Sequence, residues 1–498
     1  MRVLLVDVQE PVAALLRMAL SQRHEVVSLG GDPRDLEICR QAAGCDVVVH
    51  GFAPGADALA RIDAAGRGTW NLLTTTRARR YVQISTMRLF ERYDPAWHLD
   101  EQFPPLPSTD PDHLAPYLAE VASREILRSR PVEGLVLRLA EVIDADTFDR
   151  GPVEPDWLHV DDAVTAVVAA VEAPLPPLPT PRWRCLNIVR GDASSRYPLG
   201  AAAAPPLSFS PAHRSGEPAP DGGPTPIPAI PGPPGPVTGL PEPHRVLVLG
   251  AAGPLGAATS AELRARGLHL RVSDIGPLTE LVSAQDGPRP IRTEPPDEER
   301  TLDVTDPVEV SRAAQDMDAI VNCTVIRNDP AEAFRVNMLG AHNVMTAAVE
   351  HGIRRVVQTG PAMTLGDHPA GYTDDSGLGS DLPPRPGDNL YFVSKYLGLE
   401  ICRIFAEEHD IACPILLYSC FLDPEKAPAW AAPAFSITWA DAARAMAAAV
   451  QVGALPRPAP LVNVLADAPH DRYRSDAARE ILGWTATEQL DRFWLRRY

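Results

Sequence analysis

The stretch RVLVLGAAGPLGAAT, residues 245–259, decides the fold of this chain. It begins with an apolar run typical of a buried strand, passes through a turn that holds Gly250, Gly253 and Gly256, and enters an apolar pattern with helical spacing. Glycine lets the backbone approach an anionic group closely, and the N-terminus of the following helix favours negative charge. A strand, a glycine-rich turn and a helix in this order predict the first unit of a doubly wound α/β domain.

A second version of this stretch opens the chain. RVLLVDVQEPVAALL, residues 2–16, carries its apolar residues at the same positions, about 240 residues earlier. Further segments match in the same order: CDVVVHGFA (45–53) with MDAIVNCTV (317–325), RRYVQIST (79–86) with RRVVQTGP (354–361), and WLHVDDAVTAVVAAV (157–171) with SITWADAARAMAAAV (436–450). Both halves alternate β-branched strands with amphipathic helices. We therefore expect an α/β fold with two Rossmann-like doubly wound parallel-sheet domains, produced by a tandem duplication.

A proline-rich segment separates the halves. Residues 191–243 hold 15 of the 53 prolines, with Gly, Ala and Ser between them, so this segment lacks the apolar residues to build a core. We expect domains at residues 1–193 and 244–498, joined by a Pro/Gly-rich linker at 194–243.

Composition and charge exclude several classes of protein. A net charge of −19 disfavours nucleic-acid binders and acidic-membrane binders, because their phosphates would be repelled. The seven cysteines form no C-x-x-C pair, so we expect neither a metal site nor a disulfide framework. No signal sequence and no membrane-length apolar run is found, so we expect a soluble, cytoplasmic protein.

An acidic residue follows the second strand of the second half. Asp274 lies 24 residues after Gly250, where a carboxylate accepts hydrogen bonds from an adenosine ribose and repels a 2′-phosphate. This spacing predicts NAD as the cofactor in preference to NADP.

A candidate acid/base pair lies in LYFVSKYLGLE, residues 390–400. Tyr391 and Lys395 are four residues apart, so they share one face of a helix. The Lys395 ammonium is expected to lower the pKa of the Tyr391 phenol, which then exchanges a proton with a substrate hydroxyl. Lys395 is also expected to bind the nicotinamide ribose.

Together, the glycine-rich turn, the acidic residue and the Y-x-x-x-K helix resemble the extended short-chain dehydrogenase/reductase family, which includes NAD-dependent epimerases and dehydratases of nucleotide sugars. The resemblance covers residues 245–498 and, more weakly, 1–193. It implies a substrate-binding region from about residue 420 and a remnant of such a region in the first half.

The same resemblance assigns further positions. It places Asp303 and Val304 at the adenine ring and Asn322 on the strand that passes the cofactor. It also places Asn337 on the long helix behind the site.

One part of the family's site is missing. The family carries Ser or Thr at the end of the fifth strand, and the alignment puts Pro361 there. Proline has no side-chain donor, so we expect Thr359 or water to take this role. An Ala-Met pair follows Pro361 in place of the family's acidic dehydratase residues, which makes a sugar 4,6-dehydratase mechanism unsuitable.

The first half lacks other parts. The three glycine positions fall on Asp7, Glu10 and Ala13, so we expect no cofactor there. Tyr117 occupies the tyrosine position, but Val121 stands where the lysine should be. Thr86 does occupy the Ser/Thr position; a composite site using it is disfavoured, because the family's active sites lie far from the dimer interface.

The resemblance also suggests why the first half is retained. Family members dimerise by packing two helices from each protomer into a four-helix bundle. We expect the two halves to pair within the chain in this way, through helices near residues 64–77, 113–130, 333–351 and 389–408.

These observations predict an NAD-dependent oxidoreductase or epimerase that acts on a secondary alcohol of a polar metabolite, such as a nucleotide sugar or a natural-product intermediate. Two alternatives stay open: a non-catalytic NAD-binding scaffold or sensor, and the same fold performing non-redox elimination or cyclisation.

Overall fold

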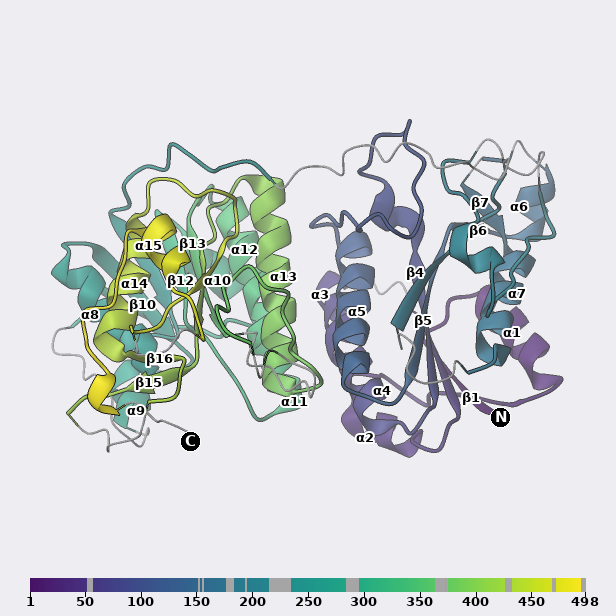
Figure 1. The fold of residues 1–498 in the computed structure, drawn as a ribbon, viewed down its shortest axis with the longest axis horizontal. Helices are drawn as coiled ribbons and strands as arrows, with labels where there is room; N and C mark the ends of the chain where they lie inside the picture. The colour runs from purple at the N-terminus through teal and green to yellow at the C-terminus, as the bar shows by residue number, and fades with distance from the viewer. Residues whose placement is uncertain are drawn as a thin grey trace. The chain divides into compact units, whose positions relative to one another are not determined.

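The computed structural model divides the chain into two compact units, Met1–Gly232 and Pro233–Tyr498, each with its own parallel sheet (Figure 1). The residues described are 1–51, 57–150, 153–154, 156–175, 183–192, 195–214, 234–283, 295–362, 372, 375–425, 432–467 and 472–493. Residues 215–233 of the linker predicted at 194–243 lie outside this set. Residues 195–214, in contrast, pack into the core of the first unit through Tyr197, Ala202, Leu207 and Phe209, so the first unit extends beyond the predicted boundary at 193.

The second unit contains a seven-stranded parallel sheet in the order β11-β10-β9-β12-β13-β14-β17. Its strands are β9 (Arg245–Leu249), β10 (His269–Asp274), β11 (Glu298–Thr301), β12 (Ala319–Asn322), β13 (Val356–Pro361), β14 (Ile415–Tyr418) and β17 (Leu461–Asn463). The chain reverses its direction of winding between β9 and β12, which is where open α/β sheets bind ligands, at the carboxyl ends of the strands. The predicted doubly wound fold is confirmed.

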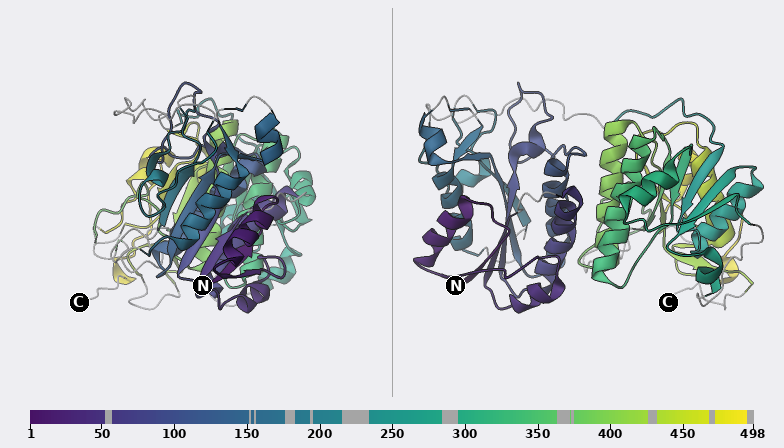
Figure 2. Two further views of the ribbon diagram at one scale, coloured as in Figure 1. Left: turned by 90° about the vertical axis from the view of Figure 1, so that its right-hand side faces the viewer. Right: turned by 180° about the vertical axis from the view of Figure 1, so that it is seen from behind.

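Helices cover both faces of this sheet. The helices α8 and α14 pack against each other on one face, whereas α10, α12 and α13 form the layer on the other face (Figures 1 and 2). The helices are α8 (Pro254–Ala265), α9 (Leu278–Ser283), α10 (Pro307–Ala314), α11 (Pro330–Phe334), α12 (Gly340–Glu350), α13 (Leu390–His409), α14 (Trp439–Gln451) and α15 (Asp476–Leu482). A two-stranded parallel pair, β15 (Cys420–Leu422) and β16 (Ser436–Thr438), lies in the predicted substrate region.

The first unit contains a six-stranded parallel sheet in the order β2-β1-β3-β4-β5-β8. Its strands are β1 (Arg2–Val6), β2 (Glu25–Ser28), β3 (Val47–His50), β4 (Arg80–Thr86), β5 (Glu133–Leu139) and β8 (Trp183–Ile188), with a separate pair β6 (Glu141–Ile143) and β7 (Trp157–His159). Its helices are α1 (Val12–Ser21), α2 (Leu36–Gln41), α3 (Ala58–Asp63), α4 (Thr69–Thr75), α5 (Pro111–Arg128), α6 (Ala145–Arg150) and α7 (Val160–Glu172). The core strands of both units are buried on both faces, as continuous apolar runs in parallel sheets require.

The two sheets differ by one strand. In the second unit β11 follows β10 and forms the edge of the sheet, whereas residues 29–46 of the first unit contain only the helix α2 between β2 and β3. The first unit therefore has no strand at the edge where the second unit presents Asp303 and Val304, directly after β11.

Each unit also contains a π-helical turn. The sequence pattern predicts continuous helices near residues 64–77 and 333–351, but π-helical turns interrupt them at Ala64–Gly68 and Arg335–Leu339. The inserted residue of a π-turn redirects the side chains around it, and such turns occur often at functional sites. Asn337 is the central residue of the second turn.

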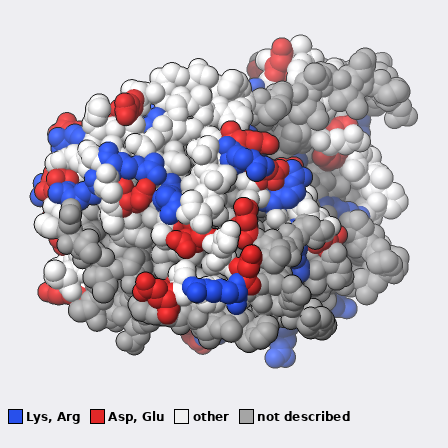
Figure 3. Space-filling model, turned by 60° about the vertical axis from the view of Figure 1, so that its left-hand side comes forward, with Lys and Arg blue, Asp and Glu red and all other residues white. Residues whose placement is uncertain are grey.

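Charged side chains of both signs are interspersed on the described part of the face shown in Figure 3. Within the described residues, no helix is both long enough and apolar enough to cross a membrane.

Candidate active site

The glycine-rich turn follows β9 at the point where the winding reverses. Gly250 has a φ of +74°, and a Cβ there would lie 2.9 Å from the backbone of Cys323 and Thr324. A Cβ on Gly256 would lie 2.2 Å from the carbonyl oxygen of Gly250. Both positions therefore require glycine, and α8 begins at Pro254 directly after Gly253. The turn leaves a side-chain-free cradle at a helix N-terminus, which suits a phosphate group.

The Asp274 carboxylate lies against this turn. One of its oxygens accepts a hydrogen bond from Ala252 N–H at 2.8 Å, and the other accepts one from Ile275 N–H at 2.9 Å. The structure thus brings the predicted ribose-binding carboxylate next to the glycine-rich cradle, and the side chain is only half-buried.

The predicted adenine positions follow β11. Asp303 is half-buried and caps its own turn by accepting a hydrogen bond from Thr305 N–H at 2.8 Å. Val304 is buried, and its carbonyl accepts a hydrogen bond from the Asn343 side chain at 3.0 Å. These contacts hold the segment firmly at the edge of the sheet beside Asp274, whose own carbonyl accepts Leu302 N–H at 2.9 Å.

Lys395 is buried in α13, with only 2% of its surface exposed. Its ammonium donates to the carbonyl oxygens of Thr324, just after β12, at 2.8 Å and of Thr359, within β13, at 3.4 Å. Burial lowers the pKa of Lys395 to about 8, and the nearby Arg327 guanidinium lowers it further. The ammonium is therefore held between the sheet and α13.

Tyr391 lies one turn earlier on α13 and is half-buried. Burial raises the pKa of its phenol, and the group that opposes this rise is Arg327, whose Cζ lies 5.1 Å from the centroid of the Tyr391 ring. The sequence predicts Lys395 as the cation that lowers this pKa. The structure places a second cation, Arg327, beside the phenol, and the Lys395 ammonium donates to two backbone carbonyls.

Sequence reasoning missed Arg327. It follows β12 by a few residues, in NCTVIRNDP, and charged residues directly after a central strand lie at the edge where α/β sheets bind ligands. That position is the signal that could have found it.

Asn337 connects the loop that carries Arg327 to α13. Its amide accepts a hydrogen bond from Ile326 N–H at 3.1 Å, donates to the Ile326 carbonyl at 2.7 Å, and donates to the Ser394 hydroxyl at 2.9 Å. Close packing of α13 on the π-turn requires Gly398, because a Cβ there would lie 2.1 Å from the Asn337 carbonyl oxygen. Asn337 thus connects the loop at Ile326 to α13, which carries Tyr391.

Pro361 is the last residue of β13, and Thr359 lies two residues before it. The Thr359 hydroxyl donates to the Asn322 carbonyl of the neighbouring strand at 2.9 Å, and the residue is buried. Thr359 therefore has no hydroxyl proton to offer at the end of the strand, which contradicts its predicted use as a donor to the reacting oxygen.

Asn322 is also engaged within the sheet. Its amide donates to the Gln358 side chain at 3.0 Å, and its oxygen accepts the Thr324 hydroxyl at 2.7 Å. Asn322 is almost fully buried, so it shapes the end of β12 through Thr324.

The corresponding turn of the first unit follows β1. Asp7 adopts a φ of +47°, the left-handed conformation that Gly250 adopts in the second unit. Burial, followed by the nearby Asp32 carboxylate, raises the pKa of Asp7 to about 6. A carboxylate thus stands in the turn where the second unit has no side chain.

An ion pair occupies the interior beside α5. Glu120, the residue before Val121, accepts two hydrogen bonds from Arg138 at 2.9 and 2.7 Å, and both residues are buried. Thr86 accepts a hydrogen bond from Arg88 N–H at 3.1 Å and caps the turn that follows β4. These polar groups are therefore used within the fold of the first unit.

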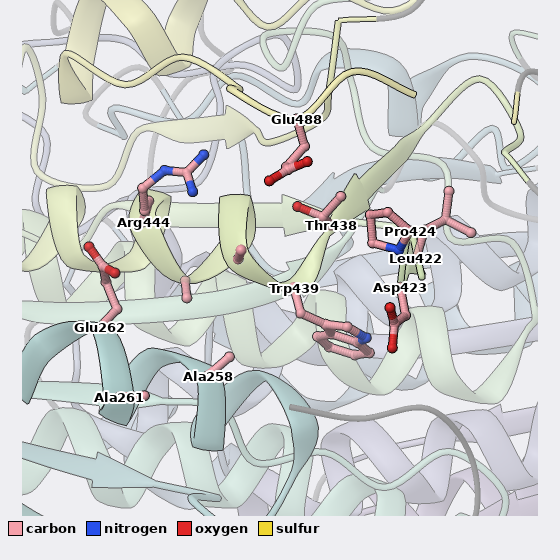
Figure 4. A pocket seen from close by; sticks show the side chains of 12 residues that line it. Ala258, Ala261, Glu262, Leu422, Asp423, Pro424, Thr438, Trp439, Arg444 and Glu488 are labelled. Atoms are coloured by element: carbon pink, nitrogen blue, oxygen red, sulfur yellow. The ribbon is translucent and has the colours of Figure 1, made fainter. Parts of the chain in front are cut away.

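A separate pocket of about 440 Å³ lies between α8, the start of α14 and the segment after β15 (Figure 4). Trp439 forms one wall and stacks on Phe421 at 4.1 Å, while Arg444 and Glu488 project toward the pocket from other sides. None of the predicted site residues lines this pocket. It borders the predicted substrate region but not Tyr391.

One cluster in the described residues resembles a metal site. His159, Asp161 and His213 of the first unit place possible ligand atoms within 4.8 Å of one another. The two imidazole rings stack at 3.7 Å and 18°, so their in-plane lone pairs cannot converge on one ion, and His159 Nδ1 already accepts Asp161 N–H at 3.1 Å. This geometry does not support a metal centre.

Comparisons with known proteins find similarity in the second half of the chain. Residues 246–429 match the model of the NAD dependent epimerase/dehydratase family. A uronate dehydrogenase from Pseudomonas putida is 28% identical over 185 residues, covering 36% of this chain and 63% of that protein. A uronate dehydrogenase from Agrobacterium fabrum is 30% identical over 166 residues, covering 33% of this chain and 56% of that protein. The chain thus spans less than two thirds of the length of these relatives.

Among solved structures, uronate dehydrogenase from Agrobacterium tumefaciens superposes with a TM-score of 0.40 and 24% identity, covering 49% of this chain and 84% of that chain.

Proposed function

We propose that the second unit binds NAD and oxidises or epimerises a secondary alcohol of a polar sugar metabolite. One observation carries this proposal: the glycine-rich cradle, the Asp274 carboxylate and the Tyr391–Lys395 face of α13 all lie at the carboxyl edge of one sheet, around the point where its winding reverses.

The chain's own residues fit this cofactor. Gly250 and Gly256 let the turn pack closely on itself and on the segment after β12, because a Cβ there would clash with backbone, and the N-terminus of α8 directly after the turn would face the pyrophosphate. Asp274 would hold the adenosine ribose, Val304 would face the adenine, and Lys395 would hold the nicotinamide ribose. NAD, when bound, supplies the hydride acceptor.

Tyr391 would then exchange the proton of the substrate hydroxyl. Because burial raises its pKa, the phenol depends on a neighbouring cation to serve as a base near neutral pH. The curated relatives are uronate dehydrogenases, so hexuronic acids are the first substrates to test, followed by nucleotide sugars.

The decisive test combines binding with turnover. The purified chain should bind NAD, and a panel of uronic acids and nucleotide sugars should include one that produces absorbance of the reduced nicotinamide. Tyr391→Phe should reduce turnover at least 100-fold while NAD binding stays unchanged. Unchanged turnover in this variant would remove Tyr391 from the mechanism.

A second candidate is a non-catalytic NAD-binding protein. The absence of a donor at Pro361 and the use of the Thr359 hydroxyl inside the sheet favour it. Bound NAD that keeps its redox state with every substrate of the panel would support this candidate.

We also propose that the first half is a duplicated copy whose own site has decayed and which pairs with the second half. This pairing is proposed from the resemblance to a family whose members dimerise through a four-helix bundle, and from the match between the two halves. Cleavage at a protease site inserted within residues 215–233 should leave two fragments that co-elute on size exclusion, and separate elution would contradict it.

A further inference from the structure

The proposed reaction needs a hydrogen-bond donor at the substrate oxygen. Negative charge develops on that oxygen when its proton leaves, and a fixed donor there contributes a large share of the rate in comparable active sites. Neither Pro361 nor Thr359 provides it, because proline has no side-chain donor and the Thr359 hydroxyl is donated to the Asn322 carbonyl.

Among the described residues, Arg327 is the charged donor beside the phenol. Its guanidinium stands over the Tyr391 ring, with 5.1 Å between Cζ and the ring centroid, and the residue is exposed. Within the described residues, no carboxylate forms an ion pair with Arg327, whereas Arg335 nearby is paired with Glu332 at 2.8 Å. The guanidinium contacts the Tyr391 phenol and, with five N–H donors, keeps others for a ligand.

The loop that carries Arg327 is held in place. Asn337 binds both backbone groups of Ile326, the residue before Arg327, and also the Ser394 hydroxyl on α13. This arrangement couples the position of the Arg327 backbone to the helix that carries Tyr391. A pre-positioned donor loses less free energy to reorganisation when charge develops.

The other described charged and titratable groups near Arg327 and Tyr391 do not serve as the donor to the substrate oxygen. Lys395 on α13 is held by two carbonyls, and burial raises the pKa of the Cys323 thiol at the end of β12 to about 12. On α11, Glu332 is paired with Arg335. In the part of the chain that the structure describes, Arg327 is thus the charged group that acts on the phenol from outside α13.

We infer that Arg327 is a catalytic residue that replaces the missing Ser/Thr: its guanidinium donates a hydrogen bond to the substrate oxygen and favours the ionised form of Tyr391. In the oxidation direction the substrate O–H bond breaks, its proton passes to the Tyr391 oxygen, and the electron pair left on the substrate oxygen forms the carbonyl as the carbon gives up its hydride to NAD. Arg327 keeps its own protons throughout. The inference rests on the proposed function, which fails separately if the wild-type chain binds no NAD.

The test does not depend on turnover alone. The ionisation of Tyr391 is measured by tyrosinate absorbance, as the difference between each Arg327 form and the same form carrying Tyr391→Phe. Arg327→Gln should shift the midpoint of this titration upward by about one pH unit or more, whereas Arg312→Gln, a change at an exposed arginine on α10, should leave it unchanged.

Kinetics then separate a catalytic role from a structural one. Arg327→Gln should lower kcat about 100-fold with NAD affinity unchanged, and added guanidinium ion should restore part of the activity. An unshifted Tyr391 titration in Arg327→Gln, or a shifted titration with unchanged kcat, would overturn the inference.

Discussion

At the scale of single residues, the side chain at one position of the turn after the first strand decides whether that turn can hold an anion. Gly250 and Asp7 share the left-handed conformation at matching points of the two units, yet one leaves a cradle and the other places a carboxylate in it. A non-glycine residue tolerates this conformation best when it is Asn or Asp, so the fold survives the change while the anion site does not.

Asp7 should therefore destabilise the first unit at neutral pH. Its folded pKa is about 6, above its ordinary value of 3.8, so the folded chain binds more protons between these pH values and stability falls as pH rises through them. Asp7→Asn keeps the shape and removes the charge. We expect a higher Tm for the variant at pH 7 and equal Tm values at pH 3.5, and a lower Tm at pH 7 would contradict this.

In the second unit, burial likewise shifts the pKa of Lys395, but this side chain is a cation. Its folded pKa of about 8 lies below the ordinary 10.5, so the unfolded chain binds more protons between these values and stability rises with pH there. Below pH 8 the full cost of the buried ammonium applies, roughly 3 kcal/mol.

Lys395→Met should consequently stabilise the protein while removing activity. The loss of the hydrogen bonds to two carbonyls offsets part of the gain, so we expect about 1–2 kcal/mol at pH 7 and no gain near pH 10.5. Urea unfolding at the two pH values measures this difference. A less stable variant at pH 7 would show that the ammonium is better solvated than its burial implies.

Several site residues could be predicted from the sequence because their motifs are local. Gly250, Gly256 and Asp274 lie within one strand-turn-helix unit and the strand after it, where spacing alone determines position. Arg327 and Thr359 could not be placed in this way. The position of the Arg327 backbone depends on the hydrogen bond between Asn337 and Ile326. The hydrogen bond from the Thr359 hydroxyl to the Asn322 carbonyl depends on the register between β12 and β13.

At the scale of elements, the π-helical turn connects the sheet edge to α13. A regular helix would follow from the apolar pattern alone, but the turn at Arg335–Leu339 carries Asn337, which bonds both the loop after β12 and the helix α13. In the first unit the matching π-turn carries Gly66 at its centre, and glycine has no side chain to make these bonds.

Asn337→Ala should loosen this connection. The variant leaves the Ile326 N–H without its side-chain acceptor and removes the bond to Ser394, which should cost about 1–3 kcal/mol of stability. Because Arg327 follows Ile326 directly, the variant should also raise the pKa of Tyr391 in the same titration. Asn343→Ala is the matched control on α12, since its amide bonds the Val304 carbonyl rather than Ile326 or Ser394. Equal titrations in both variants would remove Asn337 from the positioning of Arg327.

The edge strand β11 is an element that could not be predicted from the sequence. Three of its four residues, EERT, are charged and most are exposed, so no apolar pattern marks them as a strand. Only pairing with β10, from Arg271–Glu298 to Asp274–Thr301, defines it. The strand orders of the two sheets show that the described part of the first unit has no strand that corresponds to β11.

At the scale of the whole molecule, the central claim is that one cofactor site exists per chain and that it lies in the second unit. The two units share parallel sheets with matching strand orders apart from β11, but the cradle at Gly250 and the Asp274 carboxylate are found together in the second unit. The carboxylate of Asp7 faces the matching turn of the first unit and would repel a pyrophosphate.

Calorimetric titration of the full chain with NAD tests this claim most directly. We predict one NAD bound per chain, with binding lost in Gly256→Ala, whose Cβ would lie 2.2 Å from the Gly250 carbonyl oxygen, and retained in the first-unit variant Asp7→Asn. Circular dichroism confirms that each variant is folded. No binding by the wild-type chain, or full binding by folded Gly256→Ala, would contradict the account.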